Sequence, residues 1–129
     1  MPAAGHRELS TLALRPIVRH DGFLPIEDYG LIGDGVTAAL VGRDGSIDWL
    51  CLPRFDSQPV LARLLDRGSG SFRIAPDGAG ASRQRYLEDT GVLVTEIAGE
   101  HGAVTLEDAF ALRPGAELED DAPAGLCEL

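Results

Sequence analysis

The run VTAALVGRDGSIDWLCL, residues 36–52, decides the fold class of this chain. It consists of two apolar stretches, residues 36–42 and 46–52, separated by Arg43-Asp44-Gly45. An Asp-Gly step between two such stretches is a strong hairpin signal, because Asp and Gly tolerate the positive φ values of a tight primed turn. We therefore predict an antiparallel β-hairpin with its turn at residues 43–45.

Apolar side chains occur on both faces of the second strand of this hairpin. Successive side chains of a strand point to opposite faces, so Ile47, Trp49 and Cys51 are expected on one face. The even-numbered residues, two of them leucines, are expected on the other face. A strand with apolar groups on both faces is predicted to be central in its sheet.

Four more strand-like segments follow toward the carboxyl end, at residues 71–75, 84–87, 91–98 and 103–109. The turn sequence GEHG at 99–102 separates the last two, which predicts a second antiparallel hairpin. The chain is therefore predicted to be mainly β.

One short helix is predicted between Ser57 and Gly68. Ser57 can cap its first turn, Pro59 suits that turn, and Gly68 can follow the last one. The whole pattern favours an antiparallel β-sandwich, partial and truncated, with one short helix.

Three regions differ in composition. Residues 1–25 mix small, polar and basic types without a sustained period, and we interpret them as a flexible N-terminal leader. Residues 26–112 contain the strand-like segments and are interpreted as one β-sandwich domain. Residues 113–129 are acidic and rich in Pro, Gly and Ala, which indicates an acidic tail or a truncated continuation.

Charge and length exclude several classes of partner. A formal net charge of -10 argues against a nucleic-acid partner, because a phosphate backbone requires a basic surface. No apolar run approaches the roughly 20 residues of a membrane span, and the amino-terminal residues lack the apolar core of a secretory signal. A cytoplasmic location is expected.

Neither a metal nor a cofactor is predicted. His6, His20 and His101 are far apart, and Cys51 and Cys127 have no further ligand at metal-binding spacing. The glycine-rich stretches lack the strand–loop–helix context of a phosphate-binding loop.

A resemblance to a known family rests on the stretch IEDYGLIGDGVTAALVGRDGSIDWLCLPRFD, residues 26–56. This stretch resembles the opening of bacterial glycoside hydrolase family 15 proteins, the glucoamylase-like and trehalase-like enzymes. Weaker similarity continues through SFRIAP, Tyr86, VLVTEI and Glu107-Asp108. The chain is thus similar to the N-terminal domain of that family.

The resemblance implies a β-sandwich followed by a catalytic (α/α)6 toroid that hydrolyses α-glucosidic bonds with inversion. Inversion requires an acid and a base carboxyl group about 6.5–9.5 Å apart. In the family both are glutamates of the toroid, and no Glu of this chain matches their motif. No catalytic residue is therefore assigned, and the isolated chain, lacking its catalytic partner domain, is expected to be inactive.

The segment WLCLPRFD, residues 49–56, is the candidate site. Trp49 and Phe55 could stack on a sugar ring, and Arg54 and Asp56 could bind its hydroxyl groups. The structural alternative, which we favour, places the two aromatic residues in the core and pairs Arg54 with Asp56 to hold the bend. In either case, the bend could face the catalytic toroid as a substrate-proximal lip.

Carboxylates elsewhere are interpreted as solvated surface groups or turn caps rather than acid–base pairs. The pairs considered are Asp28 with Asp34, Asp48 with Asp56, and Glu107 with Asp108.

The leading functional hypothesis is a non-catalytic accessory domain of a glycosidase acting on trehalose or an α-linked glucose oligomer. Two alternatives stay open: a stand-alone carbohydrate-binding or interaction module, and a fragment without function. Exposed aromatic side chains would favour the first of these alternatives.

Overall fold

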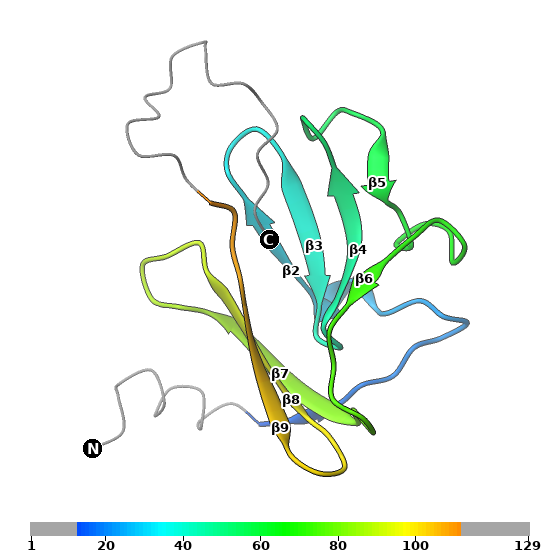
Figure 1. Cartoon of the computed structure of the whole chain (residues 1–129), viewed down its shortest axis with the longest axis vertical. Helices are drawn as coiled ribbons and strands as arrows, with labels where there is room; N and C mark the ends of the chain where they lie inside the picture. The colour runs from blue at the N-terminus through cyan, green and yellow to red at the C-terminus, as the bar shows by residue number, and fades with distance from the viewer. Residues whose placement is uncertain (1–12, 112–129) are drawn as a thin grey trace.

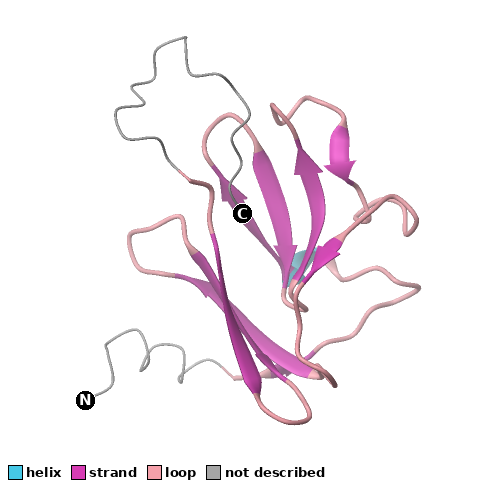
Figure 2. Ribbon diagram, in the orientation of Figure 1, coloured by secondary structure: helices cyan, strands magenta, loops and turns pink. Residues whose placement is uncertain are grey.

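The computed structural model describes residues 13–111, which form two antiparallel β-sheets (Figures 1 and 2). The first sheet has the order β2 (Tyr29–Gly33), β3 (Ala38–Gly42), β4 (Ser46–Cys51) and β5 (Pro59–Leu61), and β6 (Phe72–Arg73) also pairs with β4. The second sheet has the order β1 (Arg15–Pro16), β7 (Ala81–Tyr86), β8 (Leu93–Ala98) and β9 (Ala103–Asp108). One turn of 3-10 helix, η1 (Ile26–Asp28), precedes β2. The predicted mainly β, antiparallel, sandwich-like fold is confirmed.

The first predicted hairpin is confirmed, with a different turn. The Gly45 N–H donates to the Gly42 carbonyl, and Gly45 alone of the turn residues has a positive φ, +84°. This is the pattern of a three-residue loop that ends in a left-handed glycine, not of a two-residue primed turn. A Cβ on Gly45 would lie 2.0 Å from the Ile74 carbonyl oxygen, so the site requires glycine for space as well as for conformation.

Strand β4 is central, as predicted, but its side chains do not alternate strictly. Val41 lies opposite Ile47 whereas Leu40 lies opposite Trp49, so Asp48 is an extra residue in the ladder. Such a bulge shifts the facing of every later residue. Ile47 and Leu50 therefore both point into the core, and the expectation that they lie on opposite faces was wrong.

The predicted short helix between Ser57 and Gly68 is not formed. Its first residues are strand β5, which pairs with the side of β4 that β3 leaves open, and turns follow. The edge of β4 that β3 leaves open carries backbone N–H and C=O groups that need partners. The β-branched Val60 also suits a strand better than a short helix. The tertiary pairing outweighs the local helix signal.

Strand β1 lies within the segment interpreted as a flexible leader. Arg15 pairs with Ser82 and Pro16 with Ala81, so residues 15–16 form the edge of the second sheet. Residues 1–12 of the predicted leader and the predicted acidic tail, with Cys127, lie outside the described residues. Between residues 13 and 111, no helix has the length and apolar character needed to cross a bilayer.

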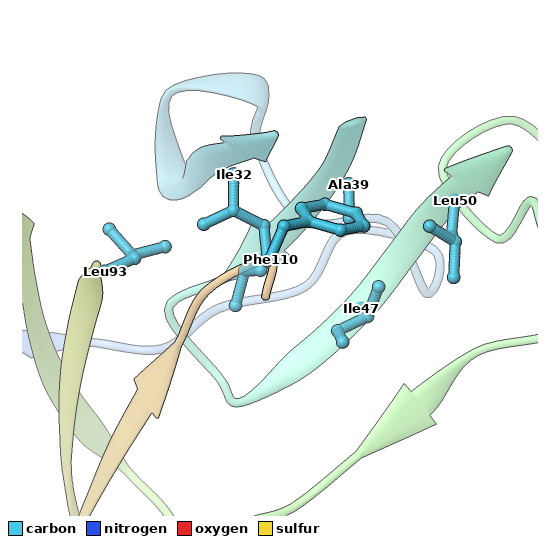
Figure 3. Close-up of a cluster of buried hydrophobic side chains, with 7 residues drawn as sticks. Ile32, Ala39, Ile47, Leu50, Leu93 and Phe110 are labelled. Atoms are coloured by element: carbon cyan, nitrogen blue, oxygen red, sulfur yellow. The ribbon is translucent and has the colours of Figure 1, made fainter. Parts of the chain in front are cut away.

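The core lies between the two sheets (Figure 3). Phe110, just after β9, and Leu93 on β8 meet side chains from β2, β3 and β4. The sheets approach closely at Gly30, where a Cβ would lie 2.5 Å from a Leu93 methyl group. The buried cluster comprises Ile32, Ala39, Val41, Ile47, Leu50, Leu93 and Phe110.

Candidate functional site

The predicted lip is a bend, residues 52–58, that leaves the end of β4 after a cis Leu52–Pro53 peptide bond. The Phe55 N–H donates to the Val36 carbonyl at 2.9 Å, which ties the bend to the β2–β3 turn. Within the bend, the Arg54 N–H donates to the Ser57 hydroxyl and the Ser57 N–H donates to the Arg54 carbonyl. The bend therefore has a defined backbone shape.

Two of the predicted site residues form an ion pair on this bend. The Arg54 Nε donates to the Asp56 Oδ1 at 3.2 Å, as the structural alternative predicted. Both side chains are 63% exposed, so water screens the attraction and the pair contributes little to stability.

The aromatic residues of the predicted site are placed differently from that alternative. Phe55 is 66% exposed, so its expected place in the core was wrong. Trp49 lies within β4, opposite Leu40 of β3, and is half-buried. The bend thus presents one exposed aromatic ring beside one solvated arginine–aspartate pair.

A second group of polar residues, which the sequence pattern did not reveal, lies at the opposite end of the β3 and β4 strands. Arg43 is 5% exposed and Asp28 6% exposed. Arg43 Nε and Nη2 each donate to one Asp28 oxygen at 3.0 Å, a bidentate ion pair. The remaining guanidinium hydrogens reach the other sheet: Nη1 donates to the Ser82 hydroxyl and to the Arg15 carbonyl, and Nη2 donates to the Pro16 carbonyl. This Arg43 cluster joins both sheets.

An adjacent cluster surrounds Arg19. Its Nε donates to Asp44 Oδ2 at 2.8 Å, and its Nη2 donates to Asp48 Oδ2 at 2.9 Å. The Tyr29 hydroxyl donates to the same Asp48 oxygen, and the Ser71 hydroxyl donates to the other oxygen at 2.7 Å. The bulge in β4 aims Asp48 at these partners. The Arg19 cluster thereby binds the amino-terminal segment to the first sheet.

The hydrogen bonds in the Arg19 cluster determine the protonation states of Asp48 and Tyr29. Burial alone would raise the pKa of Asp48, but hydrogen bonds from Tyr29, Ser71 and Arg19 outweigh it and hold the pKa below its usual range. Burial, together with the bond to Asp48, raises the pKa of Tyr29 well above its usual value. Asp48 is therefore ionised and Tyr29 neutral at neutral pH.

These two clusters correct the interpretation of the carboxylates as solvated groups. That interpretation holds for Asp56, which is exposed, but was wrong for Asp28 and Asp48, which are buried. Neither buried group suits a general acid, since each accepts charged hydrogen bonds from an arginine. Among residues 13–111, no three His, Cys, Asp or Glu side chains are placed to hold a metal ion.

Comparisons with known proteins find relatives that are similar over most of the chain. A family described as "Trehalase-like, N-terminal" matches residues 16–109. The trehalase of Mycolicibacterium smegmatis is 37% identical over 108 residues, which cover 83% of this chain and 16% of that protein. The trehalase of Mycobacterium tuberculosis is 36% identical over 98 residues, covering 75% of this chain and 14% of that protein.

An archaeal trehalase is similar to this chain to a comparable extent. Trehalase 1 of Sulfolobus acidocaldarius is 41% identical over 90 residues, covering 69% of this chain and 16% of that protein. The chain thus spans about a sixth of the length of the curated relatives it matches. No solved structure matches it.

Proposed function

Because this chain belongs to the family of trehalase-like N-terminal domains, we propose that it is the non-catalytic β-domain of a family 15 α-glycoside hydrolase. The hydrolytic groups lie in a separate (α/α)6 catalytic domain outside these 129 residues, and the substrate is trehalose or an α-linked glucose oligomer. The observation that carries the proposal is the match of residues 16–109 to the trehalase-like N-terminal family, together with the similarity to proteins named trehalase.

The state of the carboxylates supports a non-catalytic role. An inverting hydrolase needs one protonated and one ionised carboxyl group across the scissile bond. Asp28, Asp44 and Asp48 each lie in an ion pair with an arginine in the two clusters, and hydrogen bonds hold the pKa of Asp48 below its usual range. Asp108 has a pKa raised by burial, but the other carboxylate residue of its groove, Glu107, is its neighbour on the same strand, whereas an inverting pair must flank the scissile bond from opposite sides.

The role proposed for the bend is to approach the catalytic domain as a substrate-proximal lip formed by Arg54, Phe55 and Asp56, and Trp49 of β4 is the fourth residue of the proposed site. The Phe55 ring is 66% exposed on a hydrogen-bonded bend, which supports this role because the ring is free to contact a second domain. A cytoplasmic setting is part of the proposal, and the free, buried thiol of Cys51 is consistent with it.

The test measures glucose release from trehalose and from maltooligosaccharides. The 129-residue chain alone should release none. A chimera in which residues 16–109 replace the matching segment of the Mycolicibacterium smegmatis trehalase should hydrolyse trehalose. Glucose release by the short chain would overturn the non-catalytic role, and a folded but inactive chimera would count against the accessory role.

The lip is tested in the same chimera. Phe55→Ala and Arg54→Ala should raise KM or lower kcat, whereas Leu65→Ala, which truncates another exposed apolar side chain, should leave both unchanged. Unchanged kinetics in both lip variants would contradict the assignment of the lip.

A second candidate function is a sugar-binding module, which the exposure of Phe55 favours. Titration of the 129-residue chain with trehalose and maltoheptaose, followed by amide NMR, distinguishes the two. Binding that Phe55→Ala abolishes would support the module. An absence of shifts at residues 52–58 would leave the accessory domain as the function.

A further inference from the structure

The edges of the two sheets differ in how they are protected against pairing with another strand. Edge strands expose unpaired N–H and C=O groups, and proteins shorten them, place proline in them or cover them. Strand β1 has two residues and contains Pro16, and β5 has three and begins at Pro59. Strand β6 also has only two residues. In β2, the Tyr86 hydroxyl accepts from the Leu31 N–H and donates to the Leu31 carbonyl, which occupies the free edge.

Strand β9 has none of these protections within the described part of the chain. It has six residues without proline, pairs with β8 without a register shift, and has no other strand partner between residues 13 and 111. The Gly99 N–H donates to the Gly102 carbonyl. Counting from Gly102, every second residue of β9 therefore directs its backbone N–H and C=O groups toward β8. The N–H and C=O groups of Ala103, Thr105 and Glu107 therefore point away from β8, toward the open edge.

The groove beside β9 at this edge is mainly apolar. It has a volume of about 170 Å³, lies between β9 and the first sheet, and is lined by Gly45, Ile47, Phe72, Ile74, Leu106, Glu107 and Asp108. Phe72 and Ile74 are about half exposed there. Asp108 Oδ2 is buried without a hydrogen-bond partner in the described residues, and burial raises the pKa of this carboxyl.

An unpaired acceptor in apolar surroundings is costly unless a donor meets it. From these features, we propose that the β9 edge is a docking site for an extended polypeptide strand that carries a basic side chain opposite Asp108 and apolar side chains beside it. Backbone pairing with Ala103, Thr105 and Glu107 supplies affinity, and Asp108 selects the cation.

Charge favours this occupant over a second copy of the chain. At this edge the outward residues 103, 105 and 107 must face one another, so a second β9 paired antiparallel with Thr105 on a twofold axis would place Gly102 opposite Asp108. Gly102 supplies no side-chain donor. It would also bring together two chains of formal net charge -10. A basic strand avoids both costs.

The probe is the capped hexapeptide acetyl-Arg-Thr-Val-Thr-Val-Thr-amide, in which Arg faces Asp108 and the two Val face Leu106 and Val104 when it pairs antiparallel. A matched peptide has Glu in place of Arg. Added to the labelled 129-residue chain, the Arg peptide should shift the amide signals of Ala103, Thr105 and Glu107 and protect them from exchange. It should bind about tenfold more tightly than the Glu peptide, because a charge-assisted bond to a buried acceptor is gained.

Two variants separate the backbone contribution from the charge. Thr105→Pro removes an outward N–H without removing a bond to β8, so it should abolish binding while the fold is kept. Asp108→Asn should bring the two peptides to equal affinity. Should Thr105→Pro fail to fold, N-methylation of the second Thr of the Arg peptide removes the reciprocal bond of the same pair, from the peptide N–H to the Thr105 carbonyl, and this peptide should not bind.

Three results would overturn the proposal. The first is equal binding of both peptides to the unaltered chain. The second is no shift at β9 with either peptide. The third is a dimer in sedimentation velocity that Thr105→Pro dissociates, which would assign the edge to a second copy.

Discussion

The two ends of β4 carry the same residue types with opposite consequences. At one end, Arg43 and Asp28 are buried and share two hydrogen bonds, and at the other, Arg54 and Asp56 are exposed and share one. Arg43 also satisfies groups on both sheets, whereas Arg54 bonds only within its own bend among the described residues. An arginine–aspartate pair therefore organises this fold only where water is excluded and the guanidinium has several acceptors.

The largest effect should come from breaking the buried pair. Arg43→Met leaves the buried Asp28 with only the 3.3 Å contact from the half-exposed Arg15 among the described side chains and releases the Ser82 hydroxyl, so we expect a loss of about 3–5 kcal/mol in the free energy of unfolding. Urea denaturation followed by tryptophan fluorescence measures it. A loss below about 1 kcal/mol would mean that solvent enters the Arg43 cluster, contrary to its burial.

A smaller effect, dependent on pH, is expected at Asp48. Asp48→Asn should cost about 2–3 kcal/mol at pH 7, because three donors lose a charged acceptor. The folded pKa of Asp48 lies below its unfolded value, so the folded state binds fewer protons and acid favours unfolding. The unaltered chain should keep this contribution above about pH 4 and lose it as pH falls through the folded pKa.

Thermal unfolding across pH 2–7 checks this sign. The Asp48→Asn variant should show a flatter decline in stability below about pH 4 than the unaltered chain. Parallel curves for the two proteins would show that Asp48 titrates normally, and the account of its hydrogen bonds would then fail.

The contact between Tyr86 and β2 should have an intermediate effect at neutral pH. Tyr86→Phe removes the hydroxyl that bonds both the N–H and the carbonyl of Leu31, and we expect a loss of about 1 kcal/mol. The same variant opens the β2 edge, so faster amide exchange at Leu31 should accompany the loss. Unchanged exchange there would contradict the assigned contact.

The smallest effect completes the comparison. Arg54→Met should change the free energy of unfolding by less than about 0.5 kcal/mol, because the Asp56 it leaves behind is already hydrated. Urea denaturation in parallel with Arg43→Met provides the matched measurement. A loss comparable to that of Arg43→Met would show that the bend is a structural element and weaken its assignment as a lip.

The sequence predicted those parts of the fold that depend on neighbouring residues. The hairpins around Gly45 and around residues 99–102 follow from turn chemistry, and the Arg54–Asp56 pair follows from two residues on one bend. Residues 59–61 were misassigned, because pairing with β4 outweighed a helix signal that is weak over so few residues.

The buried clusters depend on residues far apart in the chain and could not be predicted in the same way. Arg43 meets Ser82 across 39 positions, and Arg19 meets Asp48 across 29. The only local signal was an aspartate within an apolar strand, Asp48, where a solvated group is out of place. Nothing near Asp48 in sequence indicates the bulge that turns it toward Arg19.

The long reach of Arg43 has a consequence for biosynthesis. A ribosome releases the first sheet before it releases Ser82, so the Arg43 guanidinium emerges with Ser82, one of its four acceptor residues, still to be translated. Phe110, which fills the space between the sheets, emerges later still. The nascent chain therefore passes through a stage in which the Asp28–Arg43 pair and the apolar side of β4 are open to water.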